Sequence, residues 1–445
     1  MKSESTATYP PAHKKGFYGW VIAATSFVTF GIAVGIPYYN LPFFYDYFQK
    51  AFHWDLKEIT LGFPLAALLT IWVGPLLIPH FSPRKLIITG AGFTALALFG
   101  FAFMHGSLTM YYVFYFLYTV GYLFAGPIPH QILVSYWFKT KRGRAIGFVY
   151  VGVGLIGSIG PFLVRPLTEK YGFQTALAVL GGLMFLVWPL AFFLLKDKPE
   201  EIGQFPDGAA EPPPDMKLSS HSFGYLLRNW PFWLLMIGSI CSIGSIGAII
   251  VHMKFVFRDA GFTDQAVLNA AWAKASVMIL WSSIAGRLII GYLADVFSKK
   301  HVMTATYFIV VATILLLLWV SPDRPYSLPL FALVFGFAMG ADYMLIPLMA
   351  AEQFGVNTLA RAMAVILPVN TIGQTWCPQG ISALREYFGN YAAPLWAVFA
   401  LAMVGALAIA LLPSDTPSKK RTGVDEPILA DNPSRSSSRT RLKSS

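Results

Sequence analysis

The chain has 445 residues, of which 56% are hydrophobic and only 12% are charged. Soluble domains carry about twice that share of charged residues, so these charges are too few to cover the surface of a soluble protein of this length. The composition therefore excludes a soluble enzyme and a disordered protein, and the presence of only two cysteines excludes a secreted disulfide scaffold. It predicts a polytopic membrane protein, because a surface that faces lipid needs no charge.

Apolar segments long enough to cross a bilayer, which takes roughly 20 residues, recur along the chain. Twelve are predicted, at 17–44, 59–80, 86–105, 110–138, 143–167, 173–195, 231–257, 266–294, 301–320, 328–354, 361–384 and 391–412. The first is too long for the core of a signal peptide, and no small-residue cleavage site follows it, so we expect it to remain in the protein. We therefore predict an all-α membrane protein with twelve transmembrane helices.

One polar, proline-rich stretch at 196–230 divides these segments into six and six, as a linker between two halves would. The Ser/Arg-rich end of the chain is typical of a disordered tail. The predicted organisation is an N-terminal stretch at 1–16, a six-helix bundle at 17–195, the linker at 196–230, a second six-helix bundle at 231–412 and the tail at 413–445.

Basic residues set the predicted orientation. If the N-terminus lies inside, the inner segments carry 23 Lys and Arg residues and the outer loops carry seven. This bias predicts that both termini and the linker are cytoplasmic, in a multi-pass protein of the plasma (inner) membrane. The net charge of +11 thus reflects topology, and we expect no nucleic-acid partner.

The two halves also match each other. An offset of 216 pairs Phe81-Ser82 with Phe297-Ser298, and an offset of 217 pairs Arg144-Ala145 with Arg361-Ala362. Each match falls at the corresponding inner loop or helix of its half. The two nearly equal offsets predict two parallel, pseudo-symmetric six-helix repeats, which is a known plan for transporters.

A distinctive motif lies in the loop expected between segments 8 and 9, where Gly286–Asp295 reads GRLIIGYLAD. Gly291 allows two helices to approach closely. Asp295 lies at an inner helix end, where it can pair with the N-terminus of a neighbouring helix or with a basic residue. We assign Asp295, Gly291 and Arg142 to a conformational latch; in the first half, Pro79 occupies the acidic position.

Several motifs together resemble the major facilitator superfamily and, within it, the branch of monocarboxylate transporters and oxalate:formate antiporters. They are Gly16–Trp20, Tyr136–Phe138 before Arg142-Gly143, Val251-His252 with Arg258–Phe262, Gly286-Arg287, Gly340–Asp342 and Phe354-Gly355. The resemblance covers residues 16–412 and implies the major facilitator fold. The sequence departs from this pattern at Tyr38, where many animal monocarboxylate carriers have a proton-accepting lysine. Tyr38 does not readily take over that role, because a phenol does not readily accept a proton at neutral pH.

Arg287 is the sharpest single candidate for binding a substrate. It lies eight residues before Asp295, which places it about 12 Å above the inner surface at 1.5 Å per residue. A charge at that depth of a ~30 Å core usually faces a partner or a wet cavity. The guanidinium fork matches a carboxylate in two hydrogen bonds, and the resemblance implies the same role. The alternative is a permanent ion pair with a neighbouring helix.

Two further residues are candidates for carrying a proton. Asp342 is the only carboxylate expected deep in a segment; it either couples a proton, pairs with Arg287 or makes a structural contact between helices. His252, near the outer end of segment 7, either titrates or is an ordinary interfacial histidine.

Other polar side chains in the segments are candidates for lining the substrate site, with packing as the alternative for each. Tyr115, Tyr118 and Tyr122 share one helix face by their spacing, and Asn370 and Gln374 are neighbours one turn apart. The remaining candidates are Tyr38, Asn40, His130, Tyr150 and Tyr343.

No nucleotide-binding loop, metal-ligand spacing or catalytic constellation is present in the sequence, so we expect neither an enzyme nor a bound cofactor or metal. The predicted function is secondary active transport of a small organic anion, of the lactate or pyruvate type, with proton coupling by alternating access. The alternatives are an organic-anion exchanger of the oxalate/formate or dicarboxylate type and, from a different class, a membrane receptor or an integral-membrane enzyme. The expected partners are the anion, protons and the lipid bilayer, and we expect the protein to act as a monomer.

Overall fold

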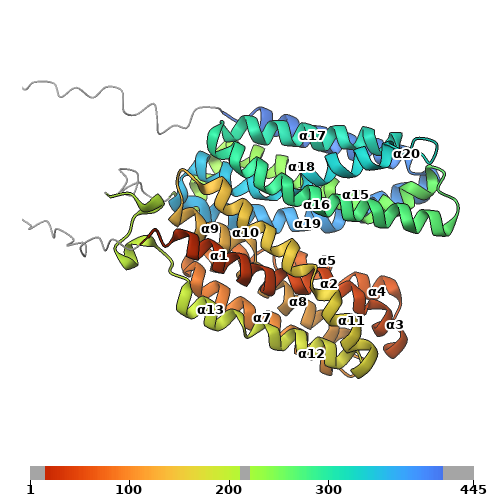
Figure 1. Ribbon diagram of the computed structural model, residues 1–445, viewed down its shortest axis with the longest axis horizontal. Helices are drawn as coiled ribbons and strands as arrows, with labels where there is room; N and C mark the ends of the chain where they lie inside the picture. The colour runs from red at the N-terminus through yellow and green to blue at the C-terminus, as the bar shows by residue number, and fades with distance from the viewer. Residues whose placement is uncertain (1–15, 211–220, 414–445) are drawn as a thin grey trace, which may run out of the picture. The chain divides into compact units, whose positions relative to one another are not determined.

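Helices account for all regular secondary structure in the residues that the computed structural model describes, which are 16–210 and 221–413. The described helices belong to one compact unit that ends at Leu412 (Figure 1). The predictions for residues 1–15, for the middle of the linker at 211–220 and for a disordered tail at 414–445 lie outside the described residues.

The first membrane span is one apolar stretch, Gly19–Phe52, that changes its helix type along its length. It consists of α1 (Gly19–Phe30), the π-helix η1 (Gly31–Gly35), α2 (Ile36–Asn40), the 3-10 helix η2 (Leu41–Phe44) and α3 (Tyr45–Phe52). Glycine is needed in η1 because α10 passes very close: a Cβ atom at Gly31 would lie 2.8 Å from the carbonyl oxygen of Gly152. Span 1 therefore packs tightly against span 5.

The second span is bent. It consists of α4 (Leu56–Thr60), α5 (Gly62–Leu69), α6 (Val73–Leu77) and the 3-10 helix η3 (Ile78–His80). Its two parts, Lys57–Leu69 and Val73–His80, meet at an angle of 42°. The Thr70 hydroxyl lies at the bend and donates to the carbonyl of Ala66 at 2.8 Å, a side-chain bond that often bends helices.

The next four spans complete the first half. They are α7 (Pro83–Phe103), α8 (Leu108–Ala125) with α9 (Pro127–Trp137), α10 (Arg142–Gly157) with α11 (Gly160–Tyr171), and α12 (Phe173–Met184) with α13 (Val187–Leu194). The break in span 4 has a clear cause: Gly126 leaves the helical region at φ −96° and ψ −145°, and Pro127 and Pro129 lack the N–H groups that would bond to the preceding turn.

In the second half, every span is a single continuous helix. These helices are α15 (Trp230–Asp259), α16 (Gln265–Val296), α17 (Lys299–Trp319), α18 (Ser327–Phe354), α19 (Val356–Phe388) and α20 (Ala392–Ala410). The described part of the linker forms the 3-10 turns η4 (Pro199–Ile202) and η5 (Pro206–Gly208) and the short helix α14 (Phe223–Arg228).

The helices pair in the same way in both halves. Span 1 packs on span 5 as α1 on α10, and span 7 on span 11 as α15 on α19. Spans 2 and 4 pack as α5 on α8, and their counterparts as α16 on α18; spans 3 and 6 pack as α7 on α12, and their counterparts as α17 on α20. Two pseudo-symmetric six-helix bundles, the arrangement of the major facilitator fold, are therefore present.

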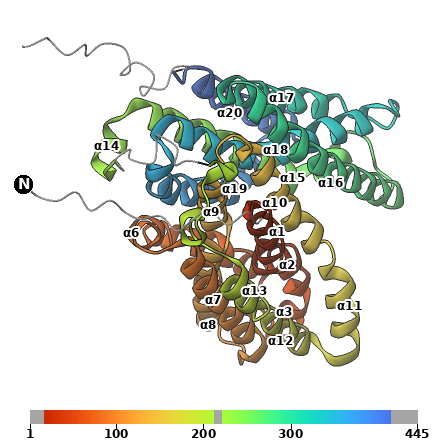
Figure 2. The same cartoon turned by 60° about the vertical axis from the view of Figure 1, so that its left-hand side comes forward.

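The two bundles meet mainly near the end of the molecule that carries the linker, which we call the linker end. There α10 packs along α16, and α19 contacts α6, η3 and α9. In Figures 1 and 2, α10 runs beside α16 between the two groups of helices. Beyond α10, the second part of span 5, α11, packs on α12 and α2 of its own bundle.

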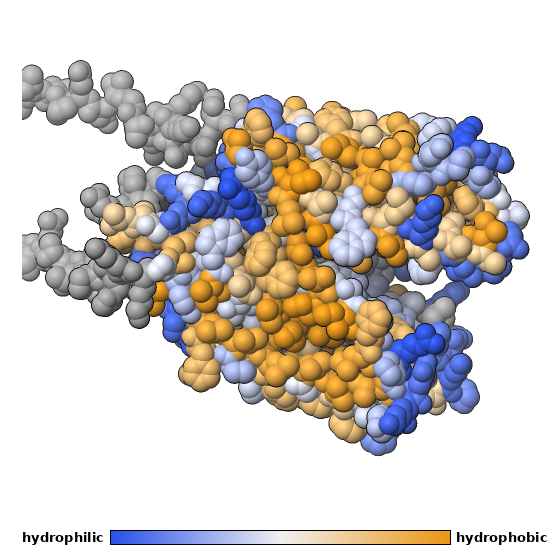
Figure 3. Space-filling view, viewed as in Figure 1, coloured by the Kyte–Doolittle hydropathy of each residue, from blue (hydrophilic) through white to orange (hydrophobic). Residues whose placement is uncertain are grey.

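The outer surface is suited to lipid. Figure 3 shows apolar side chains over the sides of both bundles, with polar ones gathered toward the two ends. Large apolar groups are openly exposed, among them Trp72 at 72% and Phe162 at 83% of their surface. An apolar surface of this extent marks a membrane interface, and the protein is a multi-pass integral membrane protein.

The predicted spans agree with the structure within a few residues at most ends. Eleven helical stretches in the described residues are long and apolar enough to cross a membrane, and the bent second span makes a twelfth. The expected loop at Gly286–Asp295 was wrong, because α16 continues to Val296. The helix ends only where Phe297 adopts extended backbone angles before Ser298 opens α17.

Candidate functional site

Arg287 lies on α16, where that helix faces α10 of the other bundle. The backbones are close here, since a Cβ atom at Gly147 would lie 2.5 Å from the carbonyl oxygen of Arg287. The guanidinium reaches Gly154, where a Cβ atom would lie 3.1 Å from Nη1. The Nε and Nη1 atoms are buried and have no hydrogen-bond partner among the described residues. In the described part of the chain, no ion pair satisfies this charge.

Tyr150 is a group of the first bundle that lies near this charge. It lies on α10, is 6% exposed, and its hydroxyl is close enough to feel the charge of Arg287. The amide of Gln131 on α9 donates to the same hydroxyl. Gln131 thereby fixes Tyr150 and leaves its phenolic O–H free to point elsewhere.

A chain of tyrosines continues from this point across the interface. The Tyr343 hydroxyl on α18 lies close to Tyr122 and Thr371, and the rings of Tyr122 and Tyr38 lie 6.2 Å apart. The amide of Gln374 on α19 donates to the Tyr38 hydroxyl on α2 at 3.5 Å. Tyr38, Tyr122, Tyr343 and Gln374 are each only partly buried, so their polar atoms can reach a ligand.

The structure thus brings six of the predicted residues together from six helices of the two bundles. They are Tyr38, Tyr122, Tyr150, Arg287, Tyr343 and Gln374. One strong cation is surrounded by phenolic hydroxyls and an amide, and these groups all bind carboxylate oxygens well. We call this set the Arg287 cluster.

Four other predicted residues each make their contacts within their own bundle, three in the first and one in the second. Tyr115 is hydrogen-bonded to Tyr45 at 3.1 Å, and Tyr118 is 2% exposed in the same aromatic core. Asn40 donates to the carbonyl of Gly157 at 3.3 Å and ties span 1 to span 5. Asn370 accepts from the hydroxyl of Ser239 at 2.9 Å and ties α19 to α15.

His130 has both ring nitrogens occupied by protein partners. Nε2 lies 3.0 Å from the Thr29 hydroxyl and Nδ1 lies 2.8 Å from the carbonyl of Gly126. The ring stacks on Phe30 with centroids 4.9 Å apart. His130 is completely buried, and these contacts hold α9 against α1.

Asp342 does not pair with Arg287 and faces the interior of its own bundle. One carboxyl oxygen, Oδ1, accepts from the Ser242 hydroxyl at 3.3 Å, and Oδ2 has no hydrogen-bond partner. The Tyr307 hydroxyl of α17 faces the same carboxyl group.

His252 joins three elements near the end opposite the linker. Its Nδ1 lies 2.9 Å from the Tyr391 hydroxyl, just before α20, and its Nε2 lies 2.9 Å from the carbonyl of Pro378 on α19. Because a carbonyl only accepts, Nε2 carries a hydrogen and donates, and in the neutral ring Nδ1 accepts from Tyr391. Burial raises the pKa of the Tyr391 phenol, which keeps this donor protonated.

At the linker end, the carboxylate of Asp295 caps α10 of the other bundle. Its two oxygens accept from the backbone N–H groups of Gly143 at 2.6 Å and Arg144 at 3.0 Å. The side chain of Arg144 adds an ion pair at 3.4 Å, while Arg142 instead donates to the carbonyl of Phe138 at 3.0 Å.

Glycines allow this capping contact. A Cβ atom at Gly291 would lie 2.7 Å from the carbonyl oxygen of Gly143, so neither helix could carry a side chain at this point. In the first half, the counterpart segment packs on α19, and a Cβ atom at Gly74 would lie 2.6 Å from the carbonyl oxygen of Ala364.

Several residues of these sites were not predicted. Gln131 and Thr371 give no sequence signal beyond being polar in an apolar helix. Gly143 and Gly147 are spaced as small residues are in close helix pairs, and this spacing could have revealed the contact with α16. Arg144, which meets Asp295, lies two residues after the predicted Arg142, and its side chain therefore points about 200° further round the helix.

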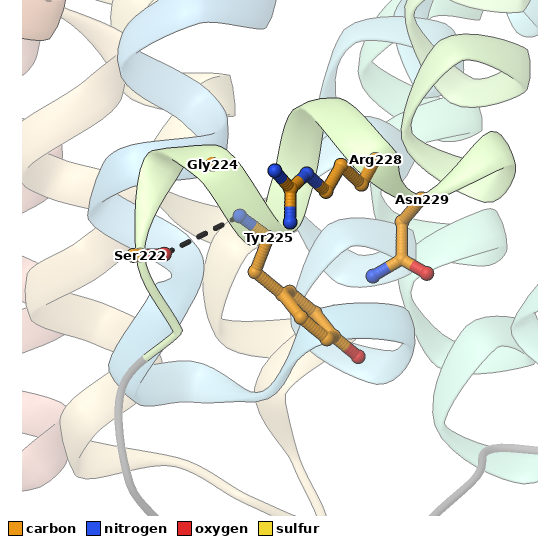
Figure 4. Close-up of a pocket in the computed structure, with 5 residues that line it drawn as sticks. All are labelled: Ser222, Gly224, Tyr225, Arg228 and Asn229. Atoms are coloured by element: carbon orange, nitrogen blue, oxygen red, sulfur yellow. Dashed lines mark hydrogen bonds between the residues drawn. The ribbon is translucent and has the colours of Figure 1, made fainter.

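A surface depression along α14 and the two residues that flank it, Ser222 and Asn229, lies apart from the Arg287 cluster. Figure 4 shows its lining residues, and the Ser222 hydroxyl accepts from the backbone N–H of Tyr225 at 3.3 Å as the cap of α14. In the described residues, no group of three or more His, Cys, Asp or Glu side chains is placed to hold a metal ion.

Comparisons with known proteins agree with this architecture. Monocarboxylate transporter 13 of Bos taurus is 23% identical over 408 residues, which covers 89% of this chain and 90% of that protein. The MFS transporter asaE of Aspergillus flavus is 25% identical over 397 residues, covering 84% of this chain and 82% of that protein. The solved structure of the proton:xylose symporter XylE matches with a TM-score of 0.71 at 12% identity, covering 91% of this chain and 98% of that chain.

The family model described as Major Facilitator Superfamily matches residues 125–378 and 270–440, which together span well over half of the chain. This match and the helix pairing described above lead to the same conclusion. The chain belongs to the major facilitator superfamily.

Proposed function

We propose that the protein is a proton-coupled secondary active transporter for a small monocarboxylate of the lactate or pyruvate type, and that it has no enzymatic activity. The observation that carries this proposal is the side chain of Arg287, whose Nε and Nη1 atoms are buried and find no hydrogen-bond partner in residues 16–210 and 221–413. A buried cation of this kind requires a counter-charge. A carboxylate substrate supplies one and satisfies the guanidinium fork with two hydrogen bonds.

The surrounding groups suit a small acid. Tyr38, Tyr122, Tyr343 and Gln374 offer hydrogen-bond donors on partly buried side chains, and their ring faces offer apolar contact to a short carbon chain. The similarity to monocarboxylate transporter 13 supports the same substrate class.

The distribution of the cluster over both bundles supports alternating access. Tyr38 and Gln374 touch across the interface, and Asp295 holds the bundles together at the linker end. A bound anion neutralises Arg287, which lowers the electrostatic cost of enclosing the site and eases the rocking of one bundle on the other. Proton coupling is assigned to Asp342 or His252.

The proposed setting is the plasma membrane, with both termini and the linker in the cytoplasm. It is supported by the excess of 23 basic residues in the inner segments over seven in the outer loops. The proposed transport unit is the monomer, with bundles at 17–195 and 231–412 joined by the linker at 196–230.

The test is uptake of labelled lactate and pyruvate into proteoliposomes under an inward proton gradient. Arg287→Ala is expected to reduce uptake by at least about a hundredfold, since it removes a charge-assisted pair from a buried site. Arg165→Ala is the matched control, because it removes an arginine whose side chain is 73% exposed in a pair with Glu169. Full uptake by Arg287→Ala would refute the proposal.

The same vesicles distinguish this symporter from the second candidate function, an organic-anion exchanger of the oxalate/formate or dicarboxylate type. An exchanger takes up label only when the vesicles are preloaded with anion, and it ignores the proton gradient. A symporter takes up label into empty vesicles when the gradient is present.

A further inference from the structure

The carboxyl group of Asp342 is completely buried in the second bundle, at 0% exposure. Within the described part of the chain, its only hydrogen bond is the contact of 3.3 Å from Ser242 on α15 to Oδ1. Oδ2 has no hydrogen-bond partner there, and neither has the hydroxyl of Tyr307. These two unsatisfied groups face each other across the α17–α18 contact.

No cation compensates this carboxyl group in the described residues. The groups that face it are Ser242 from α15 and Tyr307 from α17; Cys241 of α15 lies near that tyrosine. The charge of Arg287 on α16 is directed toward α10 instead. In the part of the chain that the structure describes, α19 provides no charged group that forms an ion pair with Asp342.

An ionised carboxylate would be strongly destabilised in this environment, because it loses its hydration and gains one long hydrogen bond. A neutral carboxylic acid carries no charge that must be compensated. Its O–H group on Oδ2 faces the Tyr307 side chain, while Oδ1 continues to accept from Ser242. The surroundings of Asp342 therefore match the protonated form.

Resting on the function proposed above, we infer that Asp342, Ser242 and Tyr307 form the proton-carrying site of the transporter, and that Asp342 holds the transported proton in this conformation. The proton is taken from water on one side of the membrane and bound at Oδ2, and it is returned to water on the other side after the bundles have moved. No other bond forms or breaks.

The position of this site on α18 explains how it would communicate with the substrate. Tyr343 follows Asp342 directly and belongs to the Arg287 cluster, where its hydroxyl lies close to Tyr122 and Thr371. Successive helix residues point about 100° apart, so one turn of α18 presents the acid to its own bundle and the phenol to the interface. A negative charge at Asp342 would repel an arriving anion, so the proton binds first.

His252 is less suited to this task. Both of its ring nitrogens already have protein partners at 2.9 Å, and in the neutral ring both contacts are satisfied. A second proton on the ring would make the Tyr391 hydroxyl turn and accept, and it would leave an extra charge in a half-apolar setting.

The test compares two assays in the same proteoliposomes. Asp342→Asn imitates the permanently protonated state with nearly the same shape. It is expected to keep exchange of labelled lactate against internal lactate at equal pH within about twofold, and to lose net uptake driven by a proton gradient by at least about tenfold. The control is Asp323→Asn, which removes a carboxylate from an exposed loop.

Each outcome has a separate meaning. Gradient-driven uptake by Asp342→Asn at the wild-type level would overturn the assignment, and so would loss of exchange together with net uptake in protein that remains folded by thermal shift. Failure of the wild-type protein to move any monocarboxylate in either assay would instead refute the proposed function.

Two further variants keep the test decisive if Asp342→Asn does not fold. Tyr307→Phe and Ser242→Ala each remove one partner of the carboxyl group, and they are expected to shift the pH at which gradient-driven uptake is half-maximal while exchange at saturating lactate stays unchanged. An unaltered pH profile in both variants would contradict the assignment.

Discussion

Replacing Asp295 with alanine should open the linker end of the transporter. In the structure this carboxylate, only 3% exposed, accepts from the N–H groups of Gly143 at 2.6 Å and Arg144 at 3.0 Å. Both donors belong to the first turn of α10, whose N–H groups have no partner within their own helix. The substitution removes the one side chain of α16 that caps this helix across the interface.

The magnitude follows from these contacts. A hydrogen bond to a charged acceptor contributes about 1.5–3 kcal/mol, so two such bonds at the lower limit stabilise the closed linker end by about 3 kcal/mol. The pair with the side chain of Arg144, which is 40% exposed, adds under about 1 kcal/mol. Because 1.4 kcal/mol changes an equilibrium constant tenfold, Asp295→Ala should shift the ratio of closed to open linker ends by about a hundredfold.

Pulsed electron paramagnetic resonance measures this ratio directly. Spin labels at Lys141→Cys and Ser298→Cys lie on exposed positions beside the contact, one on each bundle. The native Cys241 and Cys377, both free thiols, are first replaced by serine. The wild-type protein should give mainly the short distance between labels, and Asp295→Ala should give mainly the long one.

Arg144→Ala is the matched comparison, since it removes the ion pair and leaves both backbone N–H groups in place. It should change the ratio by less than about tenfold. An effect as large as that of Asp295→Ala would show that the ion pair, and not the capping of α10, closes this end. An unchanged distance distribution in Asp295→Ala would refute the reasoning altogether.

Three other changes have defined outcomes. Gly147→Val should push α10 away from α16, because a Cβ atom at this position would lie only 2.5 Å from the carbonyl oxygen of Arg287. Uptake into vesicles should be abolished, while the amount of protein inserted in the membrane stays the same. His130→Ala should lower the thermal midpoint through the loss of two hydrogen bonds, each contributing about 1 kcal/mol, with little change in KM. Asp207→Ala should make the linker easier to cleave in limited proteolysis, because Asp207 accepts from both backbone N–H groups at 139–140.

The spans could be predicted from the sequence because their lengths and apolar character follow from the thickness of the bilayer. Their internal geometry was harder to predict. The Gly126-Pro127 pair marks the break in span 4, but the π-helix at Gly31–Gly35 depends on how closely α10 passes. That distance is set by packing between helices far apart in the sequence.

In the candidate site too, some features could be predicted from the sequence and others depended on packing between helices. The depth of Arg287 in its span could be counted from the helix rise, but whether Asp342 would neutralise it could not. The two side chains come from adjacent helices, and the answer depends on the rotation of each helix about its axis. His130 and Asn40 were read as candidates from polarity alone; their hydrogen bonds to Thr29 and Gly157 depend on neighbours brought close only by the fold.

The difference in helix continuity between the two halves has a mechanical consequence. Spans 1, 2, 4, 5 and 6 are each divided into shorter helices, whereas α15 to α20 run unbroken. Each division leaves backbone groups outside the regular ladder and gives the chain a place to flex at little cost. The second bundle should therefore move as a rigid body during transport, while the helices of the first bundle bend at their breaks. Amide hydrogen exchange should reveal this as fast-exchanging sites at the ends of α5, α8 and α10 with no equivalents in the second half.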